Sequence, residues 1–401
     1  MSCINVALLG FGTVGKGVYQ SINSHQSRLE QVLGKRVRVV GILVKDLEKH
    51  KQSKKDGLVL TDSFEDILAI SDLHVVVDAI VGCEPGNVYL KKAIEKGCHV
   101  VTANKEMFAH HGEELLALAK ENGVTIGFEA TVGGGIPVIQ TIKQLLQVNR
   151  IKKVEAILNG TSNFILTSMR KEGHSFDATL KLAQQNGYAE SDPSNDIEGH
   201  DAFFKGLVLS QLIYGKTPEN HTTSRRGIRS ITADFIERAS ELGLRFRHIV
   251  TLYKENGQIH CQAEPALVSS EHPFYQVEGV QNGVSIDTDL VGNIQLNGPG
   301  AGMFPTASAI IEDIIQINRP VPAAPSFVEF QEEAEESSKW VLFSDKVDIK
   351  LPYVSKVLAR RTDKTLVVET DNIEEILTEN PLVTCFSLKG GYLHTPEKVT
   401  I

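Results

Sequence analysis

The chain has 401 residues, of which 41% are hydrophobic and 23% are charged, and this composition is typical of a soluble globular protein with more than one domain. Its formal net charge of -9 argues against nucleic acid as a main partner, because no basic excess is present to neutralise phosphates. The sequence has no apolar run of membrane-spanning length and no secretory signal at its start, and its five cysteines show no CxxC spacing, so we expect a reduced cytoplasmic protein without a membrane partner.

The first segment carries the pattern of a dinucleotide-binding domain. A strand is predicted from Cys3 to Leu9, and a GxGxxG motif follows it and opens a helix predicted from Val14 to Leu33. The residues of the motif are Gly10, Phe11, Gly12, Thr13, Val14 and Gly15. Its first glycine permits a tight turn, the second lets a pyrophosphate approach the backbone, and the third lets the helix pack on the strand. A merely structural turn is the alternative.

The charges that follow the next strand, Arg38–Val44, bear on the choice of cofactor. An acidic group at this point binds the ribose hydroxyls of NAD, whereas a basic group accepts the additional phosphate of NADP. Lys45, Asp46 and Lys49 supply both kinds of charge, so the choice stays open. The two lysines favour NADP, and solvated loop charges are the alternative.

Helices and strands continue to alternate to about residue 130. The predicted helices are Phe64–Ile70, Glu84–Lys96 and Glu113–Asn122, and the predicted strands are Val75–Val81, His99–Thr102 and Thr125–Glu129. This alternation indicates an α/β fold with a doubly wound parallel sheet, whose ligand lies beyond the carboxyl ends of the strands. Lys105 falls at such an end, where a functional role competes with that of a surface lysine.

A glycine-rich turn runs from Glu129 to Pro137 and precedes a helix predicted from Val138 to Leu146. Successive glycines let backbone carbonyls converge with Glu129 on a hard cation. A flexible hinge between two domains explains the same residues equally well.

A strand is predicted next from Val154 to Leu158, followed by a helix that ends at Arg170. Thr161 or Ser162 can cap the start of this helix.

The stretch from Gly187 to Lys205 gathers carboxylates and one lysine ahead of a long apolar segment. Its carboxylates are Glu190, Asp192, Asp196 and Asp201. If a helix begins at Asp201, Asp201 and Lys205 lie one turn apart on the same face. A charged pair on an apolar helix is costly unless it is used, which favours a functional role over an ordinary salt bridge.

The rest of the chain mixes helices with β-prone runs. The predicted elements are the helix Ala233–Leu242, the strands Arg247–Tyr253, Ile259–Ala263, Val284–Asp287 and Asn293–Leu296, a helix from the Gly298–Gly302 turn to Ile317, the strand Trp340–Ser344, the helix Leu351–Arg361, the strand Thr365–Thr370, the helix Ile373–Asn380 and the strand Val383–Leu388. Asn256-Gly257 and Asn282-Gly283 are predicted turns of antiparallel hairpins. Pro320–Pro325 is a stiff linker, and an acidic run, Glu329–Glu336, follows it.

Motifs that are spread over residues 1–320 occur together in one order. They are GFGTVG at 10–15, VTANK at 101–105, EATVGGGIP at 129–137, NGTSNFIL at 159–166, GYAESDPSNDIEGHDAFFK at 187–205 and GPGAGMFPTASAI at 298–310. In this combination the sequence resembles the homoserine dehydrogenases. The resemblance implies a reversible, NAD- or NADP-dependent interconversion of L-homoserine and L-aspartate 4-semialdehyde, on the route to threonine and methionine. It also implies a homodimer or homotetramer, and a monofunctional enzyme without an aspartate-kinase segment.

The resemblance implies roles for individual residues. Lys205 passes the proton to and from the substrate oxygen, and Lys105 is a second essential lysine beside the nicotinamide and the substrate. Glu190 and Asp201 hold the substrate, and Gly187 lines the same pocket. The remaining implied contacts are those of Gly300 and Gly302 with the cofactor, and those of Glu129 and the carbonyls of Val132, Gly134 and Ile136 with a sodium ion.

The expected division is a Rossmann-type domain of residues 1–130 with 298–318, an α+β catalytic and dimerisation domain of residues 131–297, and a small α+β C-terminal module of residues 326–401. Many members of the family carry a regulatory ACT domain at this end, with four strands and an Asp-x-Pro-Gly loop. This tail has three clear strands and lacks that glycine, so a reduced ACT-like module and an unrelated cap both stay open. Two alternative functions are a catalytically inactive sensor of the cofactor and a dehydrogenase of another amino-acid aldehyde. The presence of Lys105 and Lys205 with the carboxylates favours an enzyme over the sensor.

Overall fold

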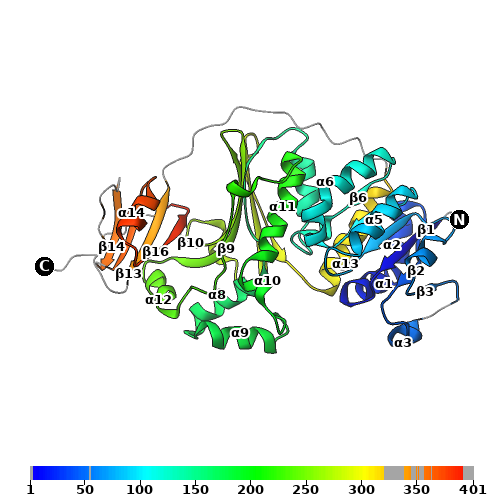
Figure 1. Ribbon diagram of the computed structural model, residues 1–401, viewed down its shortest axis with the longest axis horizontal. Coiled ribbons are helices and arrows are strands. Elements are labelled where there is room, and N and C mark those ends of the chain that lie inside the picture. The colour runs from blue at the N-terminus through cyan, green and yellow to red at the C-terminus, as the bar shows by residue number, and fades with distance from the viewer. Residues whose placement is uncertain are drawn as a thin grey trace.

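A computed structural model describes residues 3–53, 56–319, 338–344, 349, 351, 356–362 and 364–391. The predicted linker, Pro320–Pro325, and the acidic run, Glu329–Glu336, lie outside these residues. The described part is elongated, with a parallel sheet at one end, a mixed sheet through the middle and the C-terminal strands at the other end (Figure 1). Among the described residues, no helix has the length and apolar character that crossing a membrane requires.

The N-terminal part forms a six-stranded parallel sheet in the order β3-β2-β1-β4-β5-β6. The strands are β1 (Cys3–Leu9), β2 (Arg36–Leu43), β3 (Val59–Thr61), β4 (Val75–Asp78), β5 (His99–Thr102) and β6 (Ile126–Gly127). The helices are α1 (Thr13–Ser24), α2 (Gln26–Leu33), α3 (Leu47–His50), α4 (Phe64–Leu68), α5 (Gly86–Glu95) and α6 (Lys105–Glu121). Because the order reverses beside β1, a crevice for a ligand opens there at the carboxyl ends of the strands.

Helices cover both faces of this sheet, so its strands bury apolar side chains on both sides. One covering helix, α13 (Met303–Ile317), returns from much later in the chain and packs on α1. A Cβ atom on Gly17 of α1 would lie 2.7 Å from the carbonyl oxygen of Met303. The contact between these helices is therefore close enough to require glycine.

Most of the elements predicted for this part are confirmed, but the ends of several differ. The helix predicted from Val14 to Leu33 is two helices broken at His25. At the break the side chains of Ser24 and His25 contact the carbonyl of Ser21 and compete with the helical hydrogen bonds. Helix α6 begins at Lys105 instead of Glu113 because Asn104 caps it, accepting the N–H of Met107 at 3.1 Å.

The middle of the chain forms a mixed ten-stranded sheet in the order β12-β11-β7-β9-β10-β16-β13-β15-β14, with β8 also paired to β10. Its strands up to residue 299 are β7 (Ile151–Ile157), β8 (Thr223–Arg225), β9 (Arg245–Glu255), β10 (Gln258–Val268), β11 (Gln281–Thr288) and β12 (Asn293–Pro299). The helices of this part are α7 (Val138–Leu145), α8 (Gly160–Glu172), α9 (Phe176–Gln185), α10 (Ser194–Ile197), α11 (His200–Tyr214) and α12 (Ala233–Glu241). The turn predicted at Asn282-Gly283 is wrong, because both residues lie inside β11 and pair with Gly298 and Asn297 of β12.

Helix α11 packs between the two sheets. On the mixed sheet, a Cβ atom on Gly206 of α11 would lie 2.7 Å from the sulfur of Cys261 and 2.9 Å from Val250. On its other side, the amide of Gln211 donates a hydrogen bond to the carbonyl of Ala109 in α6 at 2.9 Å. The helix that carries Asp201 and Lys205 is thus held directly against α6, whose first residue is Lys105.

The C-terminal strands extend the mixed sheet, because β16 (Val383–Lys389) runs parallel to β10. The other elements are β13 (Lys339–Ser344), β14 (Lys356–Thr362), β15 (Thr365–Glu369) and α14 (Ile373–Glu379). The helix predicted from Leu351 to Arg361 is wrong for the described residues from Lys356 onward, which form β14. Its leucine, alanine and arginines favour a helix, but antiparallel pairing with β15 overrides that preference. The described tail therefore has one strand more than expected.

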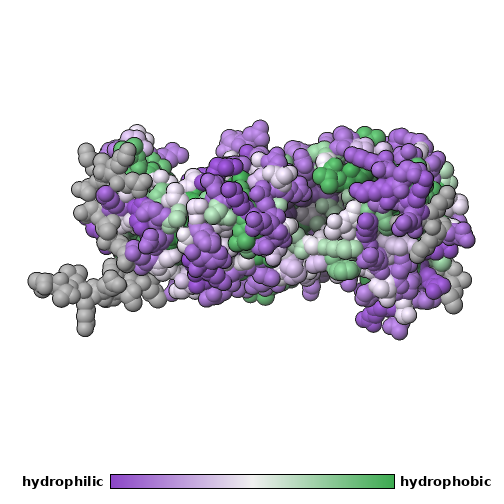
Figure 2. Space-filling view, turned by 90° about the horizontal axis from the view of Figure 1, so that it is seen from below, coloured by the Kyte–Doolittle hydropathy of each residue, from purple (hydrophilic) through white to green (hydrophobic). Residues whose placement is uncertain are grey.

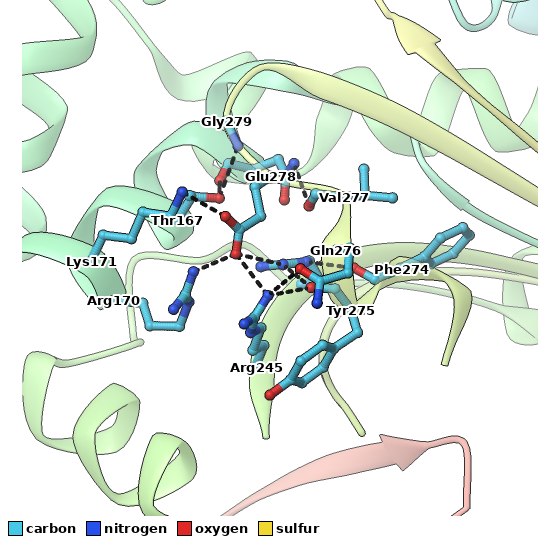
Figure 3. Close-up of polar contacts among 12 residues, drawn as sticks. Thr167, Arg170, Lys171, Arg245, Phe274, Tyr275, Gln276, Val277, Glu278 and Gly279 are labelled. Carbon is cyan, nitrogen blue, oxygen red and sulfur yellow. Dashed lines mark hydrogen bonds and ion pairs between the residues drawn. The ribbon is translucent and has the colours of Figure 1, made fainter. Parts of the chain in front are cut away.

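The C-terminal end of α8 is anchored by ion pairs that converge on Glu278 (Figure 3). The carboxylate of Glu278 contacts Arg170, the ammonium of Lys171 at 2.6 Å and the guanidinium of Arg245 at 2.8 Å. These charges together hold the carboxyl pKa of Glu278 below its usual range, although burial acts to raise it. The helix is fixed at this end, so the residues at its other end keep a defined position.

Candidate active site

Asp201 and Lys205 lie in the first turns of α11 and face the same side. The helix begins after Gly199, whose φ of 80° is in the left-handed region that favours glycine. Asp201 then occupies the first turn, where a carboxylate is favoured by the helix dipole. The ammonium of Lys205 lies 2.7 Å from Oδ2 of Asp201, with 12% of the lysine side chain exposed. The i,i+4 pair predicted from the sequence is present, with its carboxylate buried and its lysine partly buried.

A second lysine reaches Asp201 from the parallel-sheet part of the chain. The ammonium of Lys105 lies 3.0 Å from Oδ1 of Asp201, and 42% of the Lys105 side chain is exposed. The carboxylate raises the pKa of Lys105, which favours its charged form. Burial acts to raise the pKa of Asp201, but Lys205 and Lys105 outweigh it and hold the pKa well below its usual range. Asp201 and Lys105 are therefore both charged near neutral pH.

The turn between β7 and α8 completes this cluster. The carbonyl of Leu158 accepts a hydrogen bond from Lys205 at 2.6 Å. The amide of the next residue, Asn159, donates to Asp201 at 2.9 Å and to Asp196 at 2.7 Å. Burial raises the pKa of Asp196.

Two features of this turn were missed from the sequence. The cap of α8 is Asn159, which accepts the N–H of Ser162, so the expectation of Thr161 or Ser162 as the cap is wrong. Asp196 and Asn159 also belong to the cluster. The asparagine immediately before an apolar helix was the available signal for the cap.

A network at the carboxyl ends of β4 and β5 positions the start of α6. Asp78, which is fully buried, accepts hydrogen bonds from the hydroxyl of Thr102 at 2.9 Å and the N–H of Ile80 at 3.0 Å. The same hydroxyl oxygen accepts the N–H of Asn104, whose side chain donates to the carbonyl of Gly82. Lys105 follows directly, so this network fixes its backbone.

A cleft of about 960 Å³ opens at the predicted crevice of the parallel sheet. Its lining includes Gly10, Phe11, Gly12 and Thr13 from the motif, Lys16 directly after it, Lys45, Lys49, His50 and Asp62 near β2 and β3, and Ile80, Val81, Pro85 and Met303. Val14, Gly15 and Lys105 do not line it. Seen from below, the surface is hollowed between the parallel-sheet part and the middle of the molecule (Figure 2).

The motif glycines have the surroundings that dinucleotide binding requires. A Cβ atom on Gly12 would meet no atom within 4 Å, so a ligand can approach its backbone. A Cβ atom on Gly15 would lie 2.2 Å from the carbonyl oxygen of Gly10, so helix and strand are in close contact there. These are the separate functions expected of the second and third glycines.

Gly187 and Glu190 lie apart from the buried charges. Gly187 is exposed with a φ of 73°, and Glu190 is exposed too. The carboxylate of Glu190 makes no hydrogen bond or ion pair with any residue of the described part of the chain, and Asp192 caps the neighbouring backbone by accepting the N–H of Ser194. The structure therefore brings Asp201, Lys205 and Lys105 together and leaves Glu190 facing outward.

The glycine-rich turn surrounds a buried carboxylate. Glu129 is 2% exposed, and its two oxygens accept the N–H groups of Ile139 and Gln140 at 2.8 Å each. Burial raises its pKa, which the backbone hydrogen bonds oppose. Within the described chain, the carbonyls of Val132 and Gly134 accept no hydrogen bond, while that of Ile136 accepts the N–H of Val138.

The same turn touches the segment that leads into α13. A Cβ atom on Gly134 would lie 2.3 Å from the carbonyl oxygen of Gly300, and the N–H of Gly135 donates to the carbonyl of Pro299. Gly302, with a φ of 124°, then precedes α13. Gly300 and Gly302 do not line the cleft, which Met303 does.

Comparisons with known proteins find one family. The family model described as "Homoserine dehydrogenase, NAD binding domain" matches residues 10–129, and the one described as "Homoserine dehydrogenase" matches residues 137–315. The homoserine dehydrogenase of Bacillus subtilis is 40% identical over 317 residues, covering 79% of this chain and 73% of the relative. The NAD(+)-dependent homoserine dehydrogenase of Pseudomonas canavaninivorans is 34% identical over 349 residues, covering 80% of this chain and 97% of the relative.

A solved structure resembles the whole fold. The crystal structure of a homoserine dehydrogenase from Thiobacillus denitrificans superposes with a TM-score of 0.85 at 30% identity. The superposition covers 97% of this chain and 98% of that one, so it includes the C-terminal strands.

Proposed function

This chain belongs to the homoserine dehydrogenase family, and we propose that its chemistry is carried by Lys205, Lys105 and Asp201. It is an NAD(P)-dependent oxidoreductase that acts on a CH–OH group. The reaction of the family is the reversible reduction of L-aspartate 4-semialdehyde to L-homoserine, within threonine and methionine biosynthesis. The observation that carries the assignment of residues is the meeting of both lysines on one buried carboxylate.

Lys205 is the proposed proton carrier. A lysine ammonium has three hydrogens, and that of Lys205 gives two hydrogen bonds, to Asp201 at 2.7 Å and to Leu158 at 2.6 Å. One hydrogen is left to bind the substrate oxygen. During reduction of the aldehyde this proton is transferred to the carbonyl oxygen, and the reverse step removes it from the hydroxyl of homoserine. The nicotinamide, when bound, supplies or accepts the hydride.

Glu190 and Asp201 are the proposed partners of the substrate's ammonium group. An ionised carboxylate accepts about four hydrogen bonds, and Asp201 already accepts from Lys105, Lys205 and Asn159. It can therefore take one further donor at most. Glu190, exposed and unpaired among the described residues, has its full capacity and can close on the ammonium together with the loop that contains Gly187.

We propose a preference for NADP over NAD. Lys45, Lys49 and His50 line the cleft at the end of β2, where the adenosine ribose of a bound dinucleotide lies. Asp46, the acidic group that would favour NAD, does not line it and instead caps α3 by accepting the N–H of Lys49 at 3.1 Å. The basic groups thus face the cleft while the acidic one is used elsewhere. The relative from Pseudomonas canavaninivorans carries the name of an NAD(+)-dependent enzyme, so the preference is not a property of the whole family.

A sodium ion is the proposed ligand of the glycine-rich turn. Glu129 and the carbonyls of Val132, Gly134 and Ile136 supply oxygen donors of the kind that hard cations bind. The donor set fits, because within the described residues the buried carboxylate of Glu129 has no ion pair and the carbonyls of Val132 and Gly134 accept no hydrogen bond. A cation bound at this site would hold the glycine-rich turn in place against Gly300. Assays in sodium, potassium or choline chloride, with wild type and Glu129→Gln, test this site.

The remaining proposals concern organisation. The two sheets support a nucleotide-binding domain of residues 1–130 with 298–318 and a catalytic domain of residues 131–297. The order of β13 to β16 supports a reduced ACT-like module at residues 326–401. A homodimer or homotetramer would use the sheet face that carries Tyr253 and His260, opposite the face covered by α11. The cytoplasm is the proposed location, in keeping with five cysteines that form no disulfide bond within the described residues.

The test of the function is the absorbance of reduced nicotinamide, recorded with L-homoserine and NADP or NAD in turn. Homoserine-dependent reduction, faster with NADP, is expected. A purified protein that binds cofactor but reduces none of it would be a sensor, and activity with a different amino alcohol only would assign another substrate. Addition of threonine to the same assay tests the C-terminal module, and light scattering tests the oligomer.

A further inference from the structure

We propose that Asn159 is a positioning residue of the active site, whose amide bridges the carboxylates of Asp196 and Asp201 and thereby holds the Asp201–Lys205 pair in place. Asn159 is 5% exposed and lies at the junction of β7 and α8. This inference rests on the role proposed above for Lys205.

The hydrogen bonds of Asn159 fix the orientation of its amide. The oxygen faces the N–H of Ser162 at 2.7 Å, where only an acceptor can lie. The nitrogen must then face Asp196 and Asp201, both of which are acceptors. If the amide were flipped, its NH2 group would face the N–H of Ser162, and its oxygen would face the two carboxylates. None of the three hydrogen bonds could then form. Asn159 is therefore both the cap of α8 and the donor to two carboxylates.

The two carboxylates come from different elements. Asp196 belongs to the short helix α10, and Asp201 belongs to α11. Asp201 acts electrostatically to raise the pKa of Asp196, so the two charges repel each other. One neutral amide with two hydrogens reduces this repulsion without introducing a charge that competes with the lysines. A lysine or arginine at position 159 would bind the same carboxylates but would draw Asp201 away from Lys205.

The same turn holds the other member of the pair. Lys205 donates to the carbonyl of Leu158, and Asp201 accepts from the amide of Asn159. Two consecutive residues of the turn thus form hydrogen bonds with the ammonium of Lys205 and the carboxylate of Asp201. The opposite end of α8 is fixed by Glu278, so the turn cannot shift without breaking those ion pairs (Figure 3). The turn therefore sets the direction of the remaining hydrogen on Lys205.

The test is a comparison of Asn159→Ser and Asn159→Asp with the wild type. Serine and aspartate both cap helices well, so the start of α8 is preserved while the bridge is lost. We expect Asn159→Ser to lower kcat on the order of 100-fold, because the proton carrier is misplaced, with little change in the KM for the cofactor. Asn159→Asp should lower kcat further, because it places a third carboxylate beside the other two.

The pH profile separates positioning from a merely structural role. Without the amide, Asp196 binds a proton more readily, so the acid limb of kcat should move to higher pH in Asn159→Ser. The matched control is Lys181→Ala, which replaces an exposed lysine on α9 and should leave kcat and the profile unchanged. Each variant is accepted only if its circular dichroism and cofactor affinity match those of the wild type.

The outcomes are distinct. Asn159→Ser with kcat and acid limb equal to those of the wild type would overturn the inference while leaving the proposed function intact. A wild type that does not oxidise homoserine would overturn the function. In that case the titration of Asp196, followed by carbon NMR in wild type and Asn159→Ser, still decides whether the bridge exists: an unchanged pKa would exclude it.

Discussion

The ammonium of Lys105 lies 3.0 Å from the carboxylate of Asp201, although the two residues belong to helices that pack beside different sheets. Lys105 is the first residue of α6 beside the parallel sheet, and Asp201 lies in the first turn of α11 beside the mixed sheet. A residue of the parallel-sheet part and a residue of the mixed-sheet part therefore form one ion pair at the active site. The site exists only when the two parts of the chain are held together.

Lys205→Ala should abolish most of the turnover and preserve the fold. Without the ammonium of Lys205, the substrate oxygen loses its proposed proton carrier, so we expect kcat to fall about 100- to 10,000-fold. Cofactor affinity should be unchanged, because Lys205 does not line the cleft. Steady-state kinetics and cofactor titration measure both. Lys216→Ala, an exposed lysine just beyond the same helix, is the control, and near-normal turnover of Lys205→Ala would refute the assignment.

Asp78 should make the stability of the protein depend on pH. Burial raises its pKa from 3.8 to about 6, against the hydrogen bonds from Ile80 and Thr102. A raised pKa means that the folded state binds the proton more tightly than the unfolded state, so protonation stabilises the fold. The free energy of unfolding should therefore fall by about 3 kcal/mol as the pH rises from about 4 to about 6, and then level off.

Asp78→Asn, which is neutral throughout, should lack this decline. Urea denaturation of wild type and variant across that pH range gives the difference between their free energies of unfolding. Asp177→Asn, an exposed aspartate on α9, is expected to follow the wild type at every pH. Parallel curves for wild type and Asp78→Asn would show that folding does not raise the pKa of Asp78.

The sequence predicted those features that depend on local patterns. The parallel sheet follows from apolar runs that alternate with helices, and the Asp201–Lys205 pair follows from a spacing of four residues in a helix. Strand β14 was predicted as a helix because its residues favour one, and only pairing with β15 makes it a strand. The Asn282-Gly283 turn failed for a similar reason, since β7 and β12 flank β11 on both sides.

The contacts that complete the site could not be predicted, because they join distant residues. Asn159 reaches Asp201 over 42 positions in the sequence, and the start of α6 depends on Asp78 through Thr102 and Asn104. Neither has a local pattern. The charged residues after β2 were evident in the sequence, but only the structure shows that Asp46 caps α3.

Lys45 and Lys49 should determine the preference for NADP. The two ammonium groups line the cleft where the additional phosphate of NADPH is proposed to bind. The double variant Lys45→Ala, Lys49→Ala loses both contacts with this phosphate and should raise the KM for NADPH about 10-fold or more. The KM for NADH should change little, because NADH lacks that phosphate. Asp46→Asn keeps the cap of α3 and serves as the control. An equal rise in both KM values would place the lysines outside the phosphate site.

Lys389 should fasten the C-terminal strands to the catalytic sheet. Its ammonium lies 3.2 Å from Glu155 of β7, which is 6% exposed and also faces Lys153 and His272. Burial acts to raise the pKa of Glu155, but His272 and the two lysines hold it well below its usual range. A lowered pKa means that this stabilisation is present above the usual pKa of a glutamate and is lost as the pH falls toward the lowered one.

Lys389→Met should therefore lower the free energy of unfolding by about 1–3 kcal/mol at neutral pH, because a buried carboxylate loses a partner. This loss of stability should be smaller in a Glu155→Gln background, because position 155 then carries no charge for Lys389 to pair with. A double-mutant cycle by urea denaturation measures the coupling between Lys389 and Glu155. Lys356→Met on β14, the strand farthest from the junction, should show no coupling with Glu155→Gln. If Lys389→Met costs the same in both backgrounds, the ion pair between Lys389 and Glu155 does not contribute to holding β16.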